Sequence, residues 1–184
     1  MEKLHVGLGK NSYDIMIGKN FFEEFPKYIG EVYSGKKLFV ITDSNVHEIY
    51  EEKYKEMFKG FNYSIFVLQA GEKHKHIGIM PSIYSAMVNE GLTRKDMVVA
   101  FGGGVVGDIA GFAAASYMRG IGFIQIPTTI VSQVDSSVGG KVGVDLPEGK
   151  NLVGAFHQPK LVLIDSYFLN TLTDRYFYDG FGEI

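Results

Sequence analysis

The stretch "DMVVAFGGGVVGDIAGFAAASYM", Asp96 to Met118, changes its pattern twice. An apolar run that begins after Asp96 predicts a buried strand, and three consecutive glycines follow it. The remainder is rich in small and apolar residues, which predicts a helix that packs closely against its neighbours. A strand, a glycine-rich turn and a helix in this order indicate one unit of a parallel α/β sheet.

The glycines Gly102, Gly104 and Gly107 spell G-x-G-x-x-G, the fingerprint of dinucleotide-binding domains. That fingerprint normally opens its domain and is followed about 20 residues later by an acid that binds ribose. Here it lies more than half-way along the chain, and the region where the acid is expected reads "FIQIPTT", with no acid before Asp135. The spacing alone is therefore weak evidence for a dinucleotide site.

Strands and helices alternate around this unit. "KLHVGL" and "YDIMIG" around the turn "GKNS" predict an N-terminal β-hairpin. Helices are expected at 20–30, ending at Gly30, at 44–60, with Ser44 or Asn45 as the cap, and at 77–92. Together with strands at 36–43, 61–69, 122–126 and near 160, the pattern predicts one α/β domain over residues 1–184, with a mostly parallel, Rossmann-like sheet and flanking helices.

The composition excludes several classes of function. The chain has 184 residues, 46% of them hydrophobic, and no cysteine, so disulfides and thiolate metal sites are ruled out. Eighteen basic and 21 acidic side chains give a net charge of −3, which offers no nucleic-acid surface, and the apolar runs are too short to span a membrane. We expect a cytoplasmic protein whose partner is a small molecule, neither nucleic acid nor membrane.

Polar or glycine-rich residues follow four of the predicted strands, where open parallel sheets bind ligands. They are Asp43 with Asn45, Glu72 with Lys75, the glycine run with Asp108, and Thr128 with Thr129. The backbone amides of Gly103, Gly104 and Val105 suit a pyrophosphate, and Asp43 or Glu72 could accept the ribose hydroxyls, which favours NAD over NADP. In the alternative interpretation Asp43 and Ser44 cap a helix, Glu72 is a turn residue and Asp108 compensates a helix dipole.

The segment from Arg119 to Asn151 carries polar residues that a core helix and strand would not place there. Asp135, Lys141, Lys150 and Asn151 lie among glycines and apolar residues. They fit an anionic, hydroxyl-rich substrate held by point charges and an amide; the alternative is a hairpin with two solvated lysines. Metal evidence is poor, because His74 and His76 are only two positions apart, and no catalytic triad is evident.

These motifs in order, "GEKHK", "GGGVVGDIAGFAAASYMRGIGFIQIPTT", "VDSSVGGKVGVD", "GKNLVGAFHQP" and "GFGEI", resemble the 3-dehydroquinate synthase family. The resemblance runs from about Thr42 to Glu183 and covers the N-terminal, nucleotide-binding lobe of the family. It implies that an all-helical C-terminal domain, which carries most of the metal and substrate site, is absent from this chain.

The resemblance also implies roles for particular residues. Arg119, Asp135, Lys141, Lys150 and Asn151 would serve the reaction site, Arg119 across a dimer interface, and Glu183 would ligate Zn²⁺ or Co²⁺ with two histidines of the absent domain. The NAD contacts would come from Asp43, Asn45, Ala70, Gly71, Glu72, Lys73, His74, Lys75, Gly103, Gly104, Val105, Val106, Gly107, Asp108, Thr128, Thr129, Lys141, Lys150, Phe168, Leu169, Asn170, Thr171 and Leu172.

The family activity is the NAD- and metal-dependent conversion of 3-deoxy-D-arabino-heptulosonate 7-phosphate to 3-dehydroquinate and phosphate, a carbon–oxygen lyase step of the shikimate pathway that leads to chorismate and the aromatic amino acids. A homodimer is expected for the full-length protein, and residues 1–184 alone are expected to be inactive. The alternatives are another sugar-phosphate cyclase, a metal-dependent polyol dehydrogenase, and an NAD-binding module without turnover.

Overall fold

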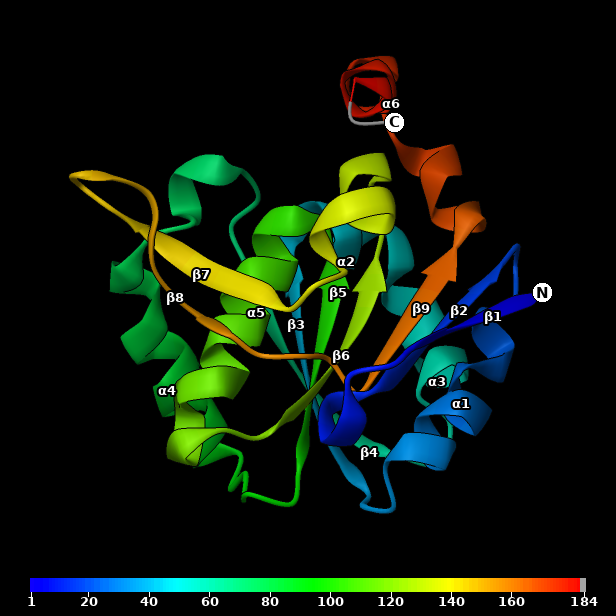
Figure 1. The fold of residues 1–184 in the computed structure, drawn as a ribbon, viewed down its shortest axis with the longest axis horizontal. Coiled ribbons are helices and arrows are strands. Elements are labelled where there is room, and N and C mark those ends of the chain that lie inside the picture. Colours follow the sequence, from blue (N-terminus) through cyan, green and yellow to red (C-terminus); the bar gives the residue numbers. More distant parts are fainter. Residues whose placement is uncertain (183–184) are drawn as a thin grey trace.

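The computed structural model describes residues 1–182 and is built around one seven-stranded sheet (Figure 1). Its strand order is β1-β2-β9-β6-β5-β3-β4, and every neighbouring pair is parallel except β1 and β2, which form the expected hairpin. The strands are β1 (Glu2–Val6), β2 (Tyr13–Gly18), β3 (Lys37–Asp43), β4 (Asn62–Leu68), β5 (Met97–Gly102), β6 (Gly122–Pro127) and β9 (Leu161–Asp165). The predicted Rossmann-like α/β fold is confirmed.

Helices cover both faces of the sheet because its central strands are apolar on both sides. On β5, Val99 and Phe101 face one core while Val98 and Ala100 face the other. The helices of the first core are α1 (Phe25–Val32), α2 (Ser44–Tyr50) and α3 (Tyr54–Met57), and those of the second are α4 (Met80–Asn89) and α5 (Gly104–Ser116). Figure 1 shows these two layers on opposite sides of the strands.

The direction of the chain along the sheet reverses between β3 and β5. From β3 the chain moves outward to the edge strand β4, then returns to β5 on the other side of β3 and proceeds to β6. The carboxyl ends of β3 and β5 therefore lie side by side where two connections diverge, which is where open α/β sheets leave a crevice for ligands. Asp43 ends β3, and the glycine run ends β5.

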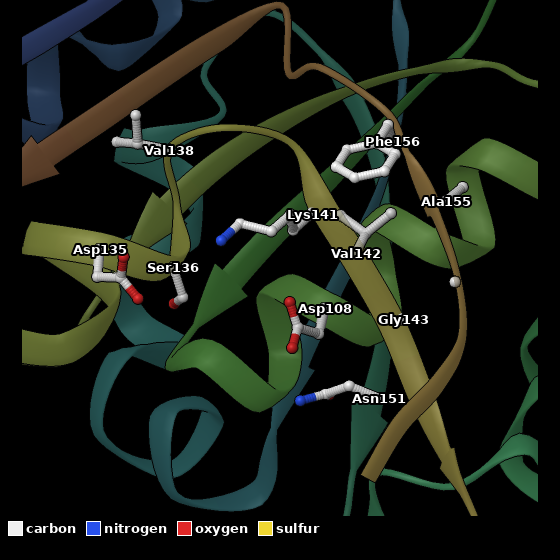
Figure 2. A pocket seen from close by; sticks show the side chains of 11 residues that line it. Asp108, Asp135, Ser136, Val138, Lys141, Val142, Gly143, Asn151, Ala155 and Phe156 are labelled. Atoms are coloured by element: carbon white, nitrogen blue, oxygen red, sulfur yellow. The ribbon is translucent and has the colours of Figure 1, made fainter.

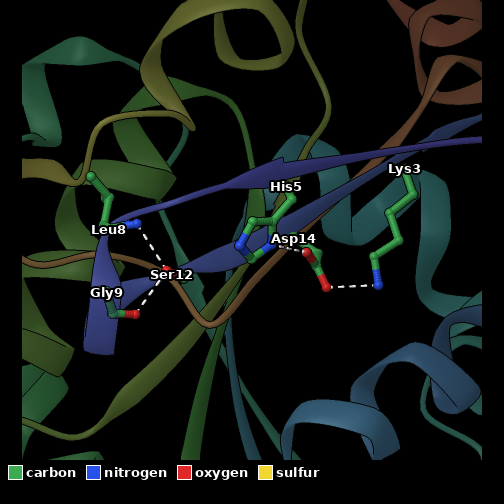
Figure 3. Close-up of polar contacts among 6 residues, drawn as sticks. All are labelled: Lys3, His5, Leu8, Gly9, Ser12 and Asp14. Atoms are coloured by element: carbon green, nitrogen blue, oxygen red, sulfur yellow. Dashed lines mark hydrogen bonds and ion pairs between the residues drawn. The ribbon is translucent and has the colours of Figure 1, made fainter.

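Charge pairing stabilises the N-terminal hairpin on its exposed face (Figure 3). Asp14 on β2 accepts a hydrogen bond from His5 Nδ1 at 2.7 Å and pairs with Lys3 Nζ at 2.8 Å. The Lys3 hydrogen bond, followed by that of His5, lowers the pKa of Asp14 below its ordinary value. In the turn, Ser12 Oγ accepts a hydrogen bond from the Leu8 amide and donates one to the Gly9 carbonyl oxygen.

Two of the predicted helices differ from the observed ones. The helix expected to stop at Gly30 runs to Val32, because Gly30 is exposed and the chain turns only where Tyr33 becomes extended and enters the core. The helix predicted over 44–60 is broken by a 3-10 turn, Glu51–Lys53, between α2 and α3. Tyr50 and Tyr54 are buried in the same core on either side of the break, so the apolar spacing does not reveal it.

A second, two-stranded sheet packs on α5, beside the carboxyl edge of the main sheet, which is called the ligand side below. Its strands are β7 (Lys141–Leu146) and β8 (Gly149–Phe156), paired antiparallel. The contact is close because Gly111 on α5 has no side chain; a Cβ there would overlap the side chain of Val142 on β7. The expectation that the small residues of this helix allow close packing is confirmed at Gly111.

We predict opposite effects for two glycine-to-alanine substitutions in helices. Gly111→Ala lowers the free energy of unfolding by about 1–3 kcal/mol, because the new methyl group overlaps Val142 in a packed interior. Gly30→Ala is the matched control; its Cβ meets no atom within 4 Å, so the better helix former raises stability by about 0.5–1 kcal/mol. Urea unfolding of both variants measures this, and equal effects would contradict the packing assignment.

Stability also depends on pH through His157, which stacks on Phe123 and donates a hydrogen bond from Nε2 to the Ile121 carbonyl oxygen at 2.8 Å. Burial lowers the pKa of His157 below its ordinary value of 6.5, although the Ile121 contact opposes the shift. The unfolded chain therefore binds the proton more readily, so His157 contributes stability fully above pH 6.5 and loses it as the pH falls towards the folded-state pKa. The unfolding temperature should therefore decrease as the pH is lowered from 7.5 to 5. His157→Gln should weaken this dependence of the unfolding temperature on pH, and an unchanged dependence would refute the assignment.

Candidate functional site

The amino end of α5 faces the carboxyl edge of the sheet without a side-chain cap. Gly103 occupies the cap position in an extended conformation, and among residues 1–182 no side chain accepts a hydrogen bond from the first amides of the helix. The first turn of a helix leaves such amides without intrahelical acceptors and carries the positive end of the helix dipole. Gly103, Gly104 and Val105 are partly exposed, so this end of α5 suits an anionic group such as a phosphate.

The glycines of this loop also fit it against its neighbours. A Cβ on Gly104 would lie 3.0 Å from Ser136 Oγ, and one on Gly103 would lie 3.1 Å from Thr129 Cγ2. Gly107 is buried, and a Cβ there would lie 2.8 Å from Gln125 Oε1, which makes it a packing residue of the helix. Val106 is buried in the core as well, so the backbone of residues 103–105 is the part of the loop that can meet a ligand.

A buried ion pair fixes the centre of the site. Lys75 Nζ lies 2.5 Å from Asp108 Oδ2 on the first turns of α5, and it donates a hydrogen bond to Asn151 Oδ1 on β8 at 2.6 Å. The Lys75 side chain is 7% exposed and that of Asp108 is 19% exposed. Burial raises the pKa of the Asp108 carboxyl above its usual range, and the Lys75 ammonium opposes that shift. Lys75 therefore joins three segments that are far apart in the sequence.

A hollow of about 480 Å³ opens beside this pair (Figure 2). Its walls come from α5, from the segment after β6, and from the β7–β8 hairpin. In Figure 2, the side chains of Asp108, Asn151 and Lys141 extend into the same space, with Asp135 and Ser136 on its opposite side. The lining residues are Asp108, Asp135, Ser136, Val138, Lys141, Val142, Gly143, Asn151, Gly154, Ala155 and Phe156.

The two hairpin lysines have different surroundings. Lys141 is exposed and lines the hollow, where its ammonium can meet an anion. Lys150 lies outside that hollow and pairs with Glu72 across the turn after β4, with Nζ 3.0 Å from Oε1. The hydrogen bond with Glu72 raises the pKa of Lys150, whose side chain is 70% exposed while that of Glu72 is 49% exposed. The interpretation as a solvated hairpin lysine therefore describes Lys150 in this structure better than Lys141.

Asp43 is the cap of α2, in place of the predicted Ser44 or Asn45. Because Asp43 is extended at the end of β3, its Oδ1 accepts hydrogen bonds from the amides of Asn45 and Val46 at 2.9 and 3.1 Å. The carboxylate still lies at the carboxyl end of β3, the neighbour of β5, together with the exposed Asn45. A capping role and a ribose contact are compatible, since one carboxylate has two oxygens.

Other predicted cofactor residues divide between surface and core. Residues 70–74 form the exposed or partly exposed turn before Lys75, and Leu169 to Leu172 are also at least partly exposed. Phe168 is 1% exposed and packs edge-on against Phe101 and Tyr50, so its side chain belongs to the core. Thr128 is buried, and Thr129 forms a local turn, with its amide and Oγ1 both 2.9 Å from Ser132 Oγ.

Arg119 lies away from the hollow. It follows α5 at its carboxyl end, and the helix separates it from Gly104 by about 20 Å at 1.5 Å per residue. The expected substrate contact is therefore not formed among the described residues, and a contact across a dimer interface stays a prediction. Glu183, the predicted metal ligand, lies outside the described residues.

The described residues do not form a metal centre. Within residues 1–182 no three His, Asp or Glu side chains lie close enough together to hold a metal ion. Across the same range no helix is long and apolar enough to cross a membrane.

Ser136, on the wall of the hollow, belongs to the polar segment from Arg119 to Asn151 that the sequence predicts to hold substrate, whereas no role was predicted for Asp145. Ser136 ends a π-helical turn, Ser132–Ser136, a type of helix that is rare and is frequent at functional sites. For Ser136 the signal in the sequence was a run of polar residues that fits neither a regular helix nor a strand. For Asp145 no such signal exists, because one partner, Lys75, is distant in the sequence and the other, Asn151, lies across the hairpin turn.

Fold and site define the chain as a Rossmann-like lobe with an anion-receptive helix end beside a polar hollow. The chain is similar to the 3-dehydroquinate synthase of Clostridium acetobutylicum, at 52% identity over the whole chain and 52% of the relative. A structure of 2-deoxy-scyllo-inosose synthase with carbaglucose-6-phosphate, NAD⁺ and Co²⁺ matches 99% of the chain and 50% of that protein, with a TM-score of 0.91 and 29% identity. ValA, a 2-epi-5-epi-valiolone synthase from Streptomyces hygroscopicus subsp. jinggangensis 5008 with NAD⁺ and Zn²⁺ bound, matches 97% of the chain and 49% of that protein, with a TM-score of 0.85 and 31% identity.

The family description "3-dehydroquinate synthase N-terminal" matches residues 65–179. The chain belongs to the 3-dehydroquinate synthase family, as the motifs predicted. It spans about half the length of the curated relatives it matches.

We predict that breaking the buried ion pair destabilises the protein. Lys75→Met leaves the Asp108 carboxylate buried without its cation, and the free energy of unfolding should fall by about 2–4 kcal/mol. In Lys75→Met with Asp108→Leu, no buried charge remains, so much of that loss should be regained. Urea unfolding of both single variants and the double variant gives the coupling free energy; additive losses would show that the pair is not coupled.

Proposed function

We propose that the full-length protein is a 3-dehydroquinate synthase, which converts 3-deoxy-D-arabino-heptulosonate 7-phosphate to 3-dehydroquinate and phosphate in the cytoplasm. The observation that carries the proposal is the hollow in which Asp108, Asp135, Lys141 and Asn151 meet beside the uncapped end of α5. Membership of the family, at 52% identity to a relative of that name, supports the same reaction.

The residues of the carboxyl edge fit NAD as the cofactor. The amides of Gly103, Gly104 and Val105 are available to a pyrophosphate, and Asp43 lies at the end of the neighbouring strand, where ribose hydroxyls would reach a carboxylate. NAD, when bound, supplies a hydride acceptor and donor that is regenerated within one turnover. The structural relatives were solved with NAD⁺, which agrees with this assignment.

The chain's own residues would bind and orient a sugar-acid phosphate. The exposed ammonium of Lys141 points into the hollow and would meet a phosphate or carboxylate as a point charge. Asn151 accepts from Lys75 through Oδ1, so its side-chain N–H groups remain to donate to a hydroxyl. Lys75 holds Asp108 against the floor of the hollow, so the polar groups are fixed before substrate arrives.

The other half of the full-length protein would complete the site. Zn²⁺ or Co²⁺ would need ligands beyond residues 1–182, which agrees with the prediction that Glu183 and histidines of a C-terminal domain hold it. Arg119 projects from the opposite end of α5, so its predicted role requires a homodimer in which one copy serves the site of the other. Another cyclase of this family, acting on a different sugar phosphate, is the second candidate, since two such enzymes match the fold at 29% and 31% identity.

The test is phosphate release by the full-length protein from the heptulosonate phosphate in the presence of NAD and a divalent metal. Lys141→Met should lower kcat/KM by about 100-fold or more, because it removes the charge that meets the anion. Lys59→Met, at an exposed lysine after α3, is the matched control and should leave turnover unchanged. Phosphate release only from another sugar phosphate would support the second candidate. Full activity of Lys141→Met would show that Lys141 is a solvated residue of the hairpin without a role in substrate binding.

A further inference from the structure

Asp145 occupies an irregular position in the β7–β8 hairpin, one residue before Leu146, which precedes the turn. The register of the two strands shifts between Val144 and Leu146, so Asp145 has no regular partner on β8. Irregularities of this kind redirect a side chain and are common beside active sites. The main chain of Asp145 instead contacts the turn after β4, where its amide donates to the Lys75 carbonyl oxygen at 2.9 Å and it forms an isolated bridge with His76.

The carboxylate of Asp145 controls the backbone of Asn151 on the other side of the hairpin turn. Its Oδ1 accepts a hydrogen bond from the Asn151 amide at 2.7 Å. Asn151 has a φ of 55°, a left-handed conformation that asparagine adopts more readily than most residues with a side chain. Within residues 1–182 only three other non-glycine residues share it: Asn20, Met118 and Arg119. The Asp145 hydrogen bond therefore supports a backbone conformation of Asn151 that departs from an extended strand.

That conformation directs the Asn151 side chain towards the site. Asn151 Oδ1 accepts from Lys75 Nζ, and the side chain lies beside Asp108 on the wall of the hollow (Figure 2). The contacts form a closed ring from the Asp145 amide to the Lys75 main chain, along the Lys75 side chain to Asn151, and back to the Asp145 carboxylate. Asp145 does not itself line the hollow.

We infer that Asp145 is a positioning residue, which sets the orientation of Asn151 and the spacing between Asn151 and Lys75 over Asp108. The inference rests on the proposed function for its catalytic consequence, because Asn151 is there a substrate contact. The ring is closed by one acidic side chain, so removing that side chain should free Asn151 while the lysine–aspartate pair remains.

The experiment uses the full-length protein with Asp145→Ala, Asp145→Asn, Asn151→Ala and the double variant Asp145→Ala with Asn151→Ala. Asp145→Ala should lower kcat/KM by about tenfold to a hundredfold, the usual range for a lost hydrogen bond to a charged group. Asp145→Asn retains an oxygen that can accept from the Asn151 amide, so it should stay within about threefold of the wild type. The double variant should be no worse than Asn151→Ala alone, because Asp145 acts through Asn151.

Glu148→Ala is the matched control, since Glu148 is an exposed acid in the same hairpin turn. Equal kcat/KM values for Asp145→Ala and Glu148→Ala, or additive losses in the double variant, would overturn the inference. A second readout is independent of turnover: hydrogen exchange at the Asn151 amide should be slow in the wild type and Asp145→Asn and faster in Asp145→Ala. If the wild type releases no phosphate, the proposed function fails, and the exchange result alone decides the role of Asp145.

Discussion

The salt bridge between Lys75 and Asp108 is the interaction on which the arrangement of the ligand side depends. Its two partners come from the turn after β4 and from the start of α5, and Asn151 connects them to the β7–β8 hairpin. Each of these segments is a connection at the edge of the sheet, where loops are ordinarily the more mobile part of a fold. A buried charge requires its partner, so the three connections hold one another in place.

The main sheet positions the segments that carry this ion pair. The reversal of strand order between β3 and β5 places the ends of two strands side by side, so an acid from one and glycines from the other meet at the same crevice. The second sheet then closes the ligand side by packing on α5. Neither feature is catalytic, but together they decide which polar residues become neighbours.

The fold could be predicted from the sequence because its determinants are local. Each of these determinants lies within a short stretch of sequence. They are the apolar runs at β3, β5 and β6, the glycines after β5 and the turn in the N-terminal hairpin. The break between α2 and α3 was not predicted, because both helices bury a tyrosine in the same core and the apolar spacing continues across it. Much of the candidate site was found through the family motifs, whereas the partners of each residue were not, since Lys75 meets Asp108 and Asn151 only in the folded chain. Phe168 shows the limit of motif transfer, because a residue inside a segment predicted to contact the cofactor has its side chain in the core.

The contact between Gly111 and Val142 has a consequence for how the sequence can vary. The helix and the hairpin touch where one partner has no side chain and the other has a branched one, and the second core surrounds both. A larger residue at position 111 fits only if the residue at position 142 becomes smaller, so the side-chain sizes at the two positions cannot change independently. Across related proteins the two positions should change as a pair, and that covariation would record the packing of the hairpin on the helix independently of any ligand.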